Sequence, residues 1–131
     1  MKILIVGAGP IGCYTARLLK EKGKGFDVEI IEEHSEIGRP VHCAGLVSQN
    51  VISEIKVSID EDCILNRIDG AEFFLNSDGF KMQRKDVALV IDREKFDRSL
   101  GSGLKVNFDS RFMGIEKRLV LAIASDMVDP E

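Results

Sequence analysis

The apolar positions in the first quarter of the chain predict a strand, a helix and a second strand. Residues 2–6 (KILIV) form an apolar run without alternation, which is typical of a parallel strand buried on both faces. Residues 10–22 are predicted as a helix that ends at Gly23 or Gly25, and residues 27–32 (DVEIIE) as a second strand. Together they predict a βαβ unit of about thirty residues, the minimum for a right-handed crossover.

The pattern changes after the second strand, and a β-rich segment is expected over residues 70–124. In AEFFLNSDGFKMQ, two short apolar runs flank residues 76–79 (NSDG), which predicts a hairpin. The other expected elements are a loop over 33–46, a short helix around 48–55, a strand over 87–93, a helix over 93–100, a strand over 104–108 and an antiparallel pair over 111–124.

Composition and charge narrow the class of protein. The chain has 131 residues, which suits a single domain, with 44% hydrophobic and 31% charged residues. A net charge of −4 gives no basic footprint, so we expect no nucleic-acid partner. No apolar run reaches the roughly 20 residues of a membrane-spanning helix, and the short run before Gly7 is a strand rather than a signal peptide. Three scattered cysteines lack metal-ligand spacing and suit thiols in a reducing cytoplasm.

Three glycines join the first strand to the first helix. Gly7, Gly9 and Gly12 form G-x-G-x-x-G directly after a strand and at the start of a helix, which is the context that gives this motif its meaning. The first glycine permits a tight turn, the second lets the backbone approach a pyrophosphate, and the third lets helix and strand pack closely. The helix N-terminus presents free N–H groups to the phosphates. The spacing therefore predicts a dinucleotide site.

An acidic residue at the end of the second strand completes this prediction. Glu32 ends the apolar run, slightly farther from Gly7 than the usual spacing of about 20 residues. Because side chains alternate along a strand, only one of Glu32 and Glu33 can face the ribose, and we choose Glu32. Its carboxylate would repel a 2′-phosphate. The unit is thus a Rossmann-like βαβ unit, but by itself it does not separate FAD from NAD.

The segment that follows resembles a known family. Residues 32–48 (EEHSEIGRPVHCAGLVS) are similar to the geranylgeranyl reductases, most closely the archaeal reductases that saturate isoprenoid chains of membrane lipids. These belong to the p-hydroxybenzoate-hydroxylase-like flavoproteins. GAGPIGCYTARLL and VIDREKFDRSL extend the resemblance over the front two-thirds of the chain, with a weaker trace up to Ile115. The resemblance implies FAD as cofactor, an isoprenoid lipid as substrate and contact with the membrane surface.

The resemblance also assigns residues to the adenosine half of FAD. It implies that Ile11 lies against the pyrophosphate through its backbone, beside Gly7, Gly9 and Gly12 of the glycine turn. Glu32 would bind the adenosine ribose. Phe112 is a weaker match to a position whose backbone touches the adenine end.

A second set of residues is assigned to the flavin half. The resemblance implies that Cys43, Ala44 and Gly45 form a loop touching the cofactor, with Cys43 on the isoalloxazine side, near the substrate double bond. Arg93 resembles the FAD-contacting arginine that opens an R-x-x-F/L helix. By residue type alone, an inert packed thiol is the more common role for a cysteine such as Cys43. The alternative for Arg93 is a solvated charge at a helix start.

Taken together, we expect an α/β fold in which residues 1–131 form one partial FAD/NAD(P)-binding domain, apparently truncated. Residues 1–46 would be the nucleotide-binding core with its flavin loop. Related reductases are longer and carry a second, Gly-Asp flavin motif that this sequence lacks, so we expect little turnover from the chain alone. A homo-oligomer or a complementing chain would cover its open surfaces. Alternatives are an FAD-dependent aromatic monooxygenase, a non-catalytic nucleotide-binding or interaction module, and an NAD-binding regulatory domain.

Overall fold

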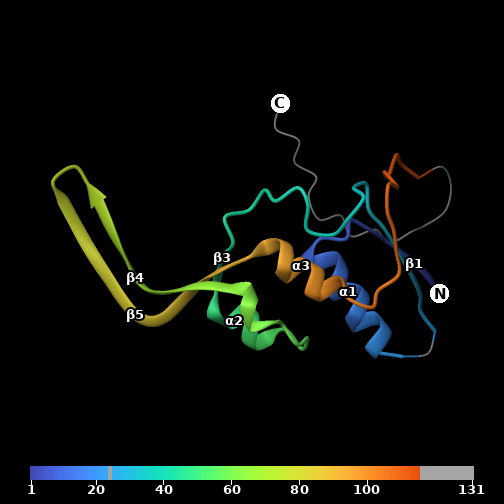
Figure 1. The fold of residues 1–131 in the computed structure, drawn as a ribbon, viewed down its shortest axis with the longest axis horizontal. Helices are drawn as coiled ribbons and strands as arrows, with labels where there is room; N and C mark the ends of the chain where they lie inside the picture. The colour runs from blue at the N-terminus through green and yellow to red at the C-terminus, as the bar shows by residue number, and fades with distance from the viewer. Residues whose placement is uncertain (24, 116–131) are drawn as a thin grey trace.

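The front of the chain forms a parallel sheet. The computed structural model describes residues 1–23 and 25–115. Strand β1 (Lys2–Val6) runs into helix α1 (Pro10–Glu21), which returns the chain to β2 (Asp27–Ile31), parallel to β1. A short strand, β6 (Val106–Asn107), adds to the other side of β2 and is also parallel (Figure 1). The predicted βαβ unit and the α/β fold are therefore confirmed.

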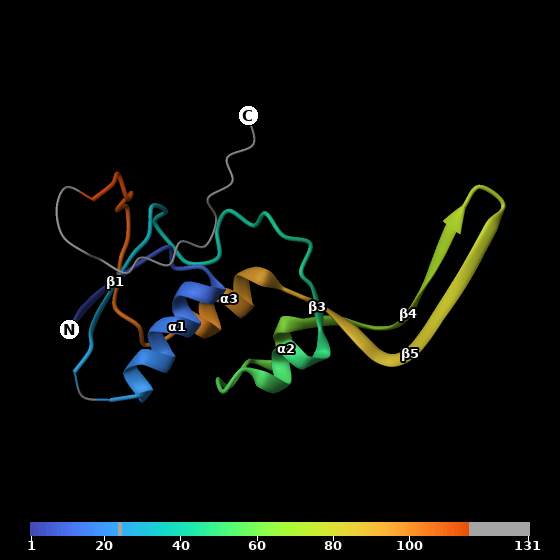
Figure 2. The same cartoon turned by 180° about the vertical axis from the view of Figure 1, so that it is seen from behind.

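Helix α3 (Arg93–Gly101) packs alongside α1, as both ribbon views show (Figures 1 and 2). Arg17 of α1 fastens the two helices together. Its Nε donates to the Leu100 carbonyl at 2.6 Å, and its Nη2 donates to the carbonyls of Ser99 at 3.2 Å and Ser102 at 2.5 Å. The last carbonyls of a helix lack partners within the helix and carry partial negative charge. A guanidinium at this end therefore stabilises α3 and fixes it against α1.

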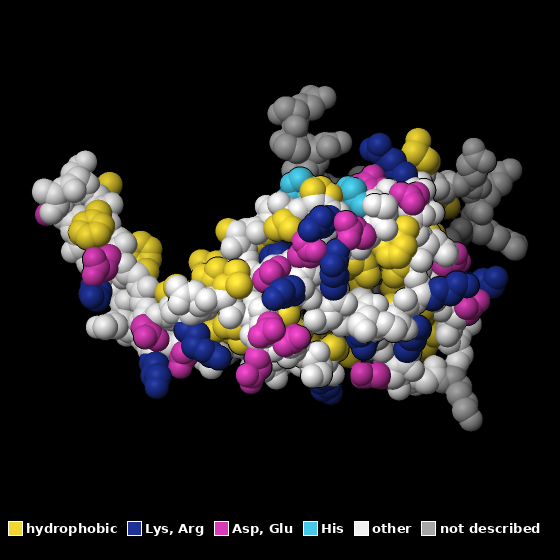
Figure 3. Space-filling model, in the orientation of Figure 1, with side chains coloured by type: hydrophobic (Ala, Val, Ile, Leu, Met, Phe, Trp, Pro, Cys, Tyr) yellow, Lys and Arg dark blue, Asp and Glu magenta, His cyan; other side chains and the backbone are white. Residues whose placement is uncertain are grey.

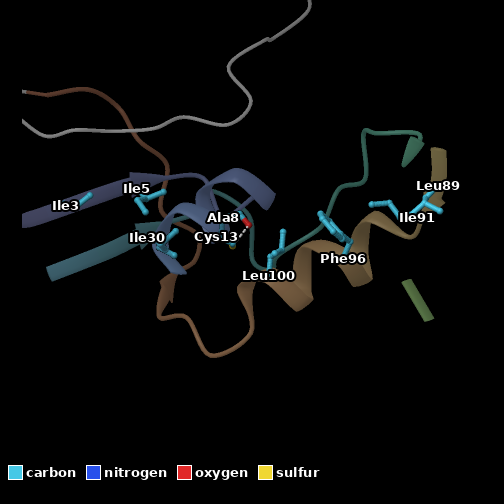
Figure 4. Packing of buried hydrophobic residues seen from close by; sticks show 10 residues of the cluster. Ile3, Ile5, Ala8, Cys13, Ile30, Leu89, Ile91, Phe96 and Leu100 are labelled. Carbon is cyan, nitrogen blue, oxygen red and sulfur yellow. Dashed lines mark hydrogen bonds between the residues drawn. The ribbon is translucent and has the colours of Figure 1, made fainter. Parts of the chain in front are cut away.

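The hydrophobic core lies between the parallel sheet, α1 and α3, and continues to the end of β5 (Figure 4). Cys13 is fully buried within it, and its thiol donates to the Ala8 carbonyl at 3.1 Å. Burial raises the pKa of Cys13 to about 12, so this thiol is neutral at ordinary pH. The largest fully buried side chains are Ile5, Ile30, Leu89, Leu100, Cys13 and Cys63.

A second, antiparallel sheet has the strand order β3-β5-β4. It consists of β3 (Leu46–Ser48), β4 (Ile64–Leu75) and β5 (Asp78–Ile91). The predicted hairpin is confirmed, with Asn76 at φ +56° in its turn. The strand predicted over 87–93 is confirmed for residues 87–91, but these residues are the end of β5 rather than a separate strand, and Arg93 already belongs to α3. The β4–β5 pairing has two register shifts, and β5 continues through both without a break.

Two short elements lie between β3 and β4 of the antiparallel sheet. Helix α2 (Gln49–Glu54) confirms the predicted short helix, and the 3₁₀ turn η1 (Glu61–Cys63) was not predicted. The Asp60 side chain accepts from the Asp62 N–H and so caps η1, while Cys63 is buried. None of the helices in residues 1–23 and 25–115 is both long and apolar enough to cross a membrane.

The outer part of the β4–β5 hairpin projects from the body as an arm (Figures 1 and 2). Its Phe73 and Phe80 rings stack across the two strands, with centroids 4.8 Å apart. Apolar side chains are visible along the arm in Figure 3. Exposed large hydrophobic residues on the arm are Phe73, Phe74, Leu75, Phe80 and Met82.

The antiparallel pair expected over 111–124 is wrong for residues 111–115, which form no strand. Just before these residues, the chain runs beside the segment that follows β2. The Asp109 N–H donates to the His34 carbonyl at 3.1 Å, and the Ser110 N–H donates to the Glu32 carbonyl at 2.8 Å. These two bonds continue the contact between the two segments beyond the paired residues of β2 and β6. The rest of the expected pair lies outside the described residues.

Candidate dinucleotide-binding site

The glycine turn, residues 7–12, is a close contact between strand β1 and helix α1. Gly7 has φ +92°, a conformation that side-chain-bearing residues rarely adopt, and its N–H donates to the Ile31 carbonyl at 2.8 Å. A Cβ on Gly12 would lie 2.1 Å from the Gly7 carbonyl oxygen. The first and third glycines of the motif are therefore required by the backbone itself.

The N-terminus of α1 opens onto this turn. Gly9 is the N-cap and has no side chain with which to cap the helix, and Pro10 has no N–H to satisfy. The first helical hydrogen bond in this turn runs from the Cys13 N–H to the Gly9 carbonyl at 2.9 Å. The N–H groups of Ile11 and Gly12 precede it and carry the partial positive charge of the helix end. Ile11 is 58% exposed.

The carboxylate of Glu32 reaches back to the glycine turn. Its Oε2 accepts a hydrogen bond from the Ala8 N–H at 2.7 Å. The Glu32 side chain is 12% exposed, whereas that of Glu33 is 49% exposed and pairs with Arg111 at 3.5 Å. Of the two acids, Glu32 is thus the one that faces the turn. Its contact with a ribose stays a prediction.

Residue His34 lies beside the same carboxylate. Glu32 Oε1 accepts from the His34 N–H at 3.1 Å and lies 2.7 Å from the ring Nδ1. Burial acts to raise the pKa of Glu32, but the hydrogen bonds from Ala8 and His34 outweigh it, and the pKa is lowered. Sequence reasoning missed His34. The signal was present, because residues two apart at a strand end face the same side.

Gly45 positions the loop that the resemblance assigns to the flavin half. Gly45 has φ +74°, and a Cβ there would lie 2.2 Å from the Ile91 carbonyl oxygen. The Ile91 N–H donates to the Gly45 carbonyl at 2.9 Å, which ties the loop to the end of β5. Next to it, the exposed thiol of Cys43 accepts from the Gly45 N–H at 3.5 Å.

Arg93 joins this loop to helix α3. Its Nε and Nη2 donate to the two carboxylate oxygens of Asp97, each at 3.1 Å. The Gly45 N–H is the largest influence that lowers the pKa of the Cys43 thiol, and the hydrogen bond and charge of Arg93 lower it further. Arg93 is therefore a paired, half-buried group rather than a solvated charge. Sequence reasoning missed Asp97, which the i,i+4 spacing within a predicted helix indicates.

Ion pairs hold the preceding part of the 33–46 loop against α3. Arg39 Nε lies 2.8 Å from Glu94 Oε2, and Arg98 Nη2 lies 2.9 Å from Glu94 Oε1. Arg98 also pairs with Glu36 of the loop. Gly38, at φ +83°, brings its backbone so close to Glu94 that a Cβ would lie 3.0 Å from the Glu94 Cα. The loop is thus fixed to α3 by charge and by close backbone approach.

The predicted site residues fall into two groups in the fold. The glycine turn, Ile11 and Glu32 lie together at the ends of β1 and β2. The second group, Cys43 to Gly45 with Arg93, lies where the loop meets β5 and α3. Phe112 is half-buried. It lies two residues after Ser110, whose N–H donates to the Glu32 carbonyl, so this part of the chain lies near the first group.

This combination of parallel strands, glycine turn and acidic strand end defines a Rossmann-like dinucleotide-binding domain. The family model of NAD(P)-binding Rossmann-like domains matches residues 5–52. A digeranylgeranylglycerophospholipid reductase of Methanosarcina mazei is 34% identical, over 86% of this chain and 30% of its own length. The same-named protein of Thermoplasma acidophilum is 30% identical, over 76% of this chain and 26% of its own.

Similarity extends to a solved structure. A geranylgeranyl bacteriochlorophyll reductase-like protein of Thermoplasma acidophilum superposes with a TM-score of 0.78, at 30% identity, covering 89% of this chain and 32% of that one. The chain belongs to the geranylgeranyl reductase family of flavoproteins, as the resemblance predicted. It spans less than a third of the length of the curated relatives cited above.

Proposed function

We propose that this chain binds the ADP moiety of FAD between its glycine turn and Glu32. It would serve as the FAD-binding part of an oxidoreductase that reduces carbon–carbon double bonds of isoprenoid lipid chains. The relatives named above are digeranylgeranylglycerophospholipid reductases, and their names supply the proposed substrate class. The same names favour a reductase over an aromatic monooxygenase.

One contact carries the nucleotide part of the proposal, the hydrogen bond from the Ala8 N–H to Glu32 Oε2 at 2.7 Å. It brings the acid of the second strand to the mouth of the glycine turn. The N-cap of α1, Gly9, makes no side-chain cap hydrogen bond. Free N–H groups suit a pyrophosphate, and an ionised carboxylate suits the hydroxyls of a ribose.

The second group of residues supports the flavin part. Cys43 is exposed, and the guanidinium of Arg93 lies beside it, held by Asp97. When bound, FAD in its reduced form would supply a hydride to one carbon of the alkene, while a proton reaches the other. The work of this chain would then be to bind and orient the cofactor through the glycine turn, the loop and Arg93.

Titration of the purified chain with FAD, followed by flavin fluorescence, tests the proposal. We expect Glu32→Gln to weaken binding about tenfold, because the amide keeps an acceptor for Ala8 but loses the charge and one ribose acceptor. Glu33→Gln is the matched control, since that exposed carboxylate faces away from the turn, and it should change the affinity less than twofold. Equal effects of the two variants, or no binding by the wild type, would overturn the proposal.

A further inference from the structure

The Glu32 carboxylate has few free positions for hydrogen bonds. Each oxygen of a carboxylate accepts about two hydrogen bonds. Oε1 already has the His34 N–H at 3.1 Å and the His34 ring Nδ1 at 2.7 Å, and Oε2 has the Ala8 N–H at 2.7 Å. Because an ionised carboxylate only accepts, Nδ1 must carry the ring proton. Among residues 1–23 and 25–115, no other donor reaches this carboxylate, so one acceptor position on Oε2 then stays open.

A ribose presents two neighbouring hydroxyl donors, so it needs two acceptor positions. Two of the three present donors are backbone N–H groups, of Ala8 and His34, and they are fixed by the fold. The third is the His34 ring, whose side chain is 46% exposed and can rotate into solvent. The ring is therefore the one donor that a ribose can displace without moving the backbone.

We infer that His34 is a specificity-determining residue that competes with ribose for Glu32. This inference rests on the proposed function. It names the residue through which the site distinguishes a ribose with two hydroxyls from a sugar with one. In the ligand-free protein the ring occupies the second acceptor position on Oε1. A ligand with a complete ribose diol must displace the ring, whereas a ligand with one hydroxyl uses the open position on Oε2.

Binding of ADP and 2′-deoxy-ADP, measured by calorimetry on the whole chain, tests this competition. Both His34→Ala and His34→Phe remove the ring donor, and phenylalanine keeps the bulk of the ring. We expect both variants to bind ADP about three- to tenfold more tightly than the wild type, because the cost of breaking one hydrogen bond is gone. Their affinity for 2′-deoxy-ADP should change less than twofold. His42→Ala, at the only other histidine, should change neither affinity.

Several outcomes would overturn the inference. Weaker ADP binding by His34→Ala would mean that the ring helps to hold the ligand. Tighter binding by His34→Ala but not by His34→Phe would mean that bulk, not the hydrogen bond, is removed. An equal gain for 2′-deoxy-ADP would mean that the diol is not what competes.

Nuclear magnetic resonance of the free protein separates this inference from the proposed function. With ¹⁵N-labelled histidine, His34 should be the Nδ1–H tautomer in the absence of any nucleotide. The Nε2–H tautomer at His34 would overturn the inference even if FAD binds normally. Conversely, the Nδ1–H tautomer together with no FAD or ADP binding would overturn the proposed function and leave the Glu32–His34 pairing intact.

Discussion

Adding one methyl group at Gly45 tests whether the loop and strand β5 meet as closely as the fold requires. Gly45→Ala places a Cβ on a residue with φ +74°, at 2.2 Å from the Ile91 carbonyl oxygen. Gly103→Ala is a matched control, because Gly103 has nearly the same φ, +72°, and no described atom lies within 4 Å of its added Cβ. The two variants share the backbone strain and differ in the steric clash.

The expected losses in the free energy of unfolding follow from these two contributions. A left-handed alanine costs about 1 kcal/mol, which is the whole effect expected at Gly103. At Gly45, the clash forces the Ile91 backbone to move, at a cost of about 1–3 kcal/mol. The movement also weakens the 2.9 Å hydrogen bond from the Ile91 N–H to the Gly45 carbonyl, worth about 1 kcal/mol. The total at Gly45 is about 3–5 kcal/mol.

Urea unfolding followed by circular dichroism measures both losses at one temperature. The Gly45→Ala midpoint should fall well below that of Gly103→Ala, with similar slopes. A Gly45→Ala chain that shows no cooperative transition, beside a normal Gly103→Ala chain, agrees with the same reasoning. Equal losses in the two variants would refute it, because strain alone would then explain both.

Two further predictions concern the cysteines. Iodoacetamide should modify Cys43 first in the folded chain, because this thiol is exposed and its pKa is lowered, while Cys13 and Cys63 are buried. Arg93→Met should slow the reaction at Cys43, as measured by mass spectrometry. An unchanged rate would contradict the contact between Arg93 and Cys43. The pKa of Cys13 is raised to about 12 from an ordinary value of 9.0, so its contribution to stability is complete below pH 9 and is lost as pH rises from 9 toward 12. Unfolding free energy should therefore fall less steeply above pH 9 in Cys13→Ala than in the wild type, and parallel curves would contradict this.

Short-range rules were enough to predict the front of the fold. The run at 2–6, the three glycines and the following helix obey steric and periodic constraints that act within a few residues. Alternation along a strand allowed only one of Glu32 and Glu33 to face the turn, and the end of the apolar run favoured Glu32. The turn residues around Asn76 marked the hairpin. These features depend on neighbouring residues, so the sequence determined them.

Other features depend on residues far apart in the chain, and only the tertiary structure decided them. Three contacts join segments that no local rule places together. They are the close approach of Gly45 to Ile91, the hydrogen bonds of Arg17 to the end of α3, and the contact of Arg93 with Cys43. The continuity of β5 was decided by its partner β4, which carries it through two register shifts in the pairing. The physical reason is that close packing and hydrogen-bond partners are settled by which segments meet, whereas periodicity and turn chemistry are settled by the segment itself.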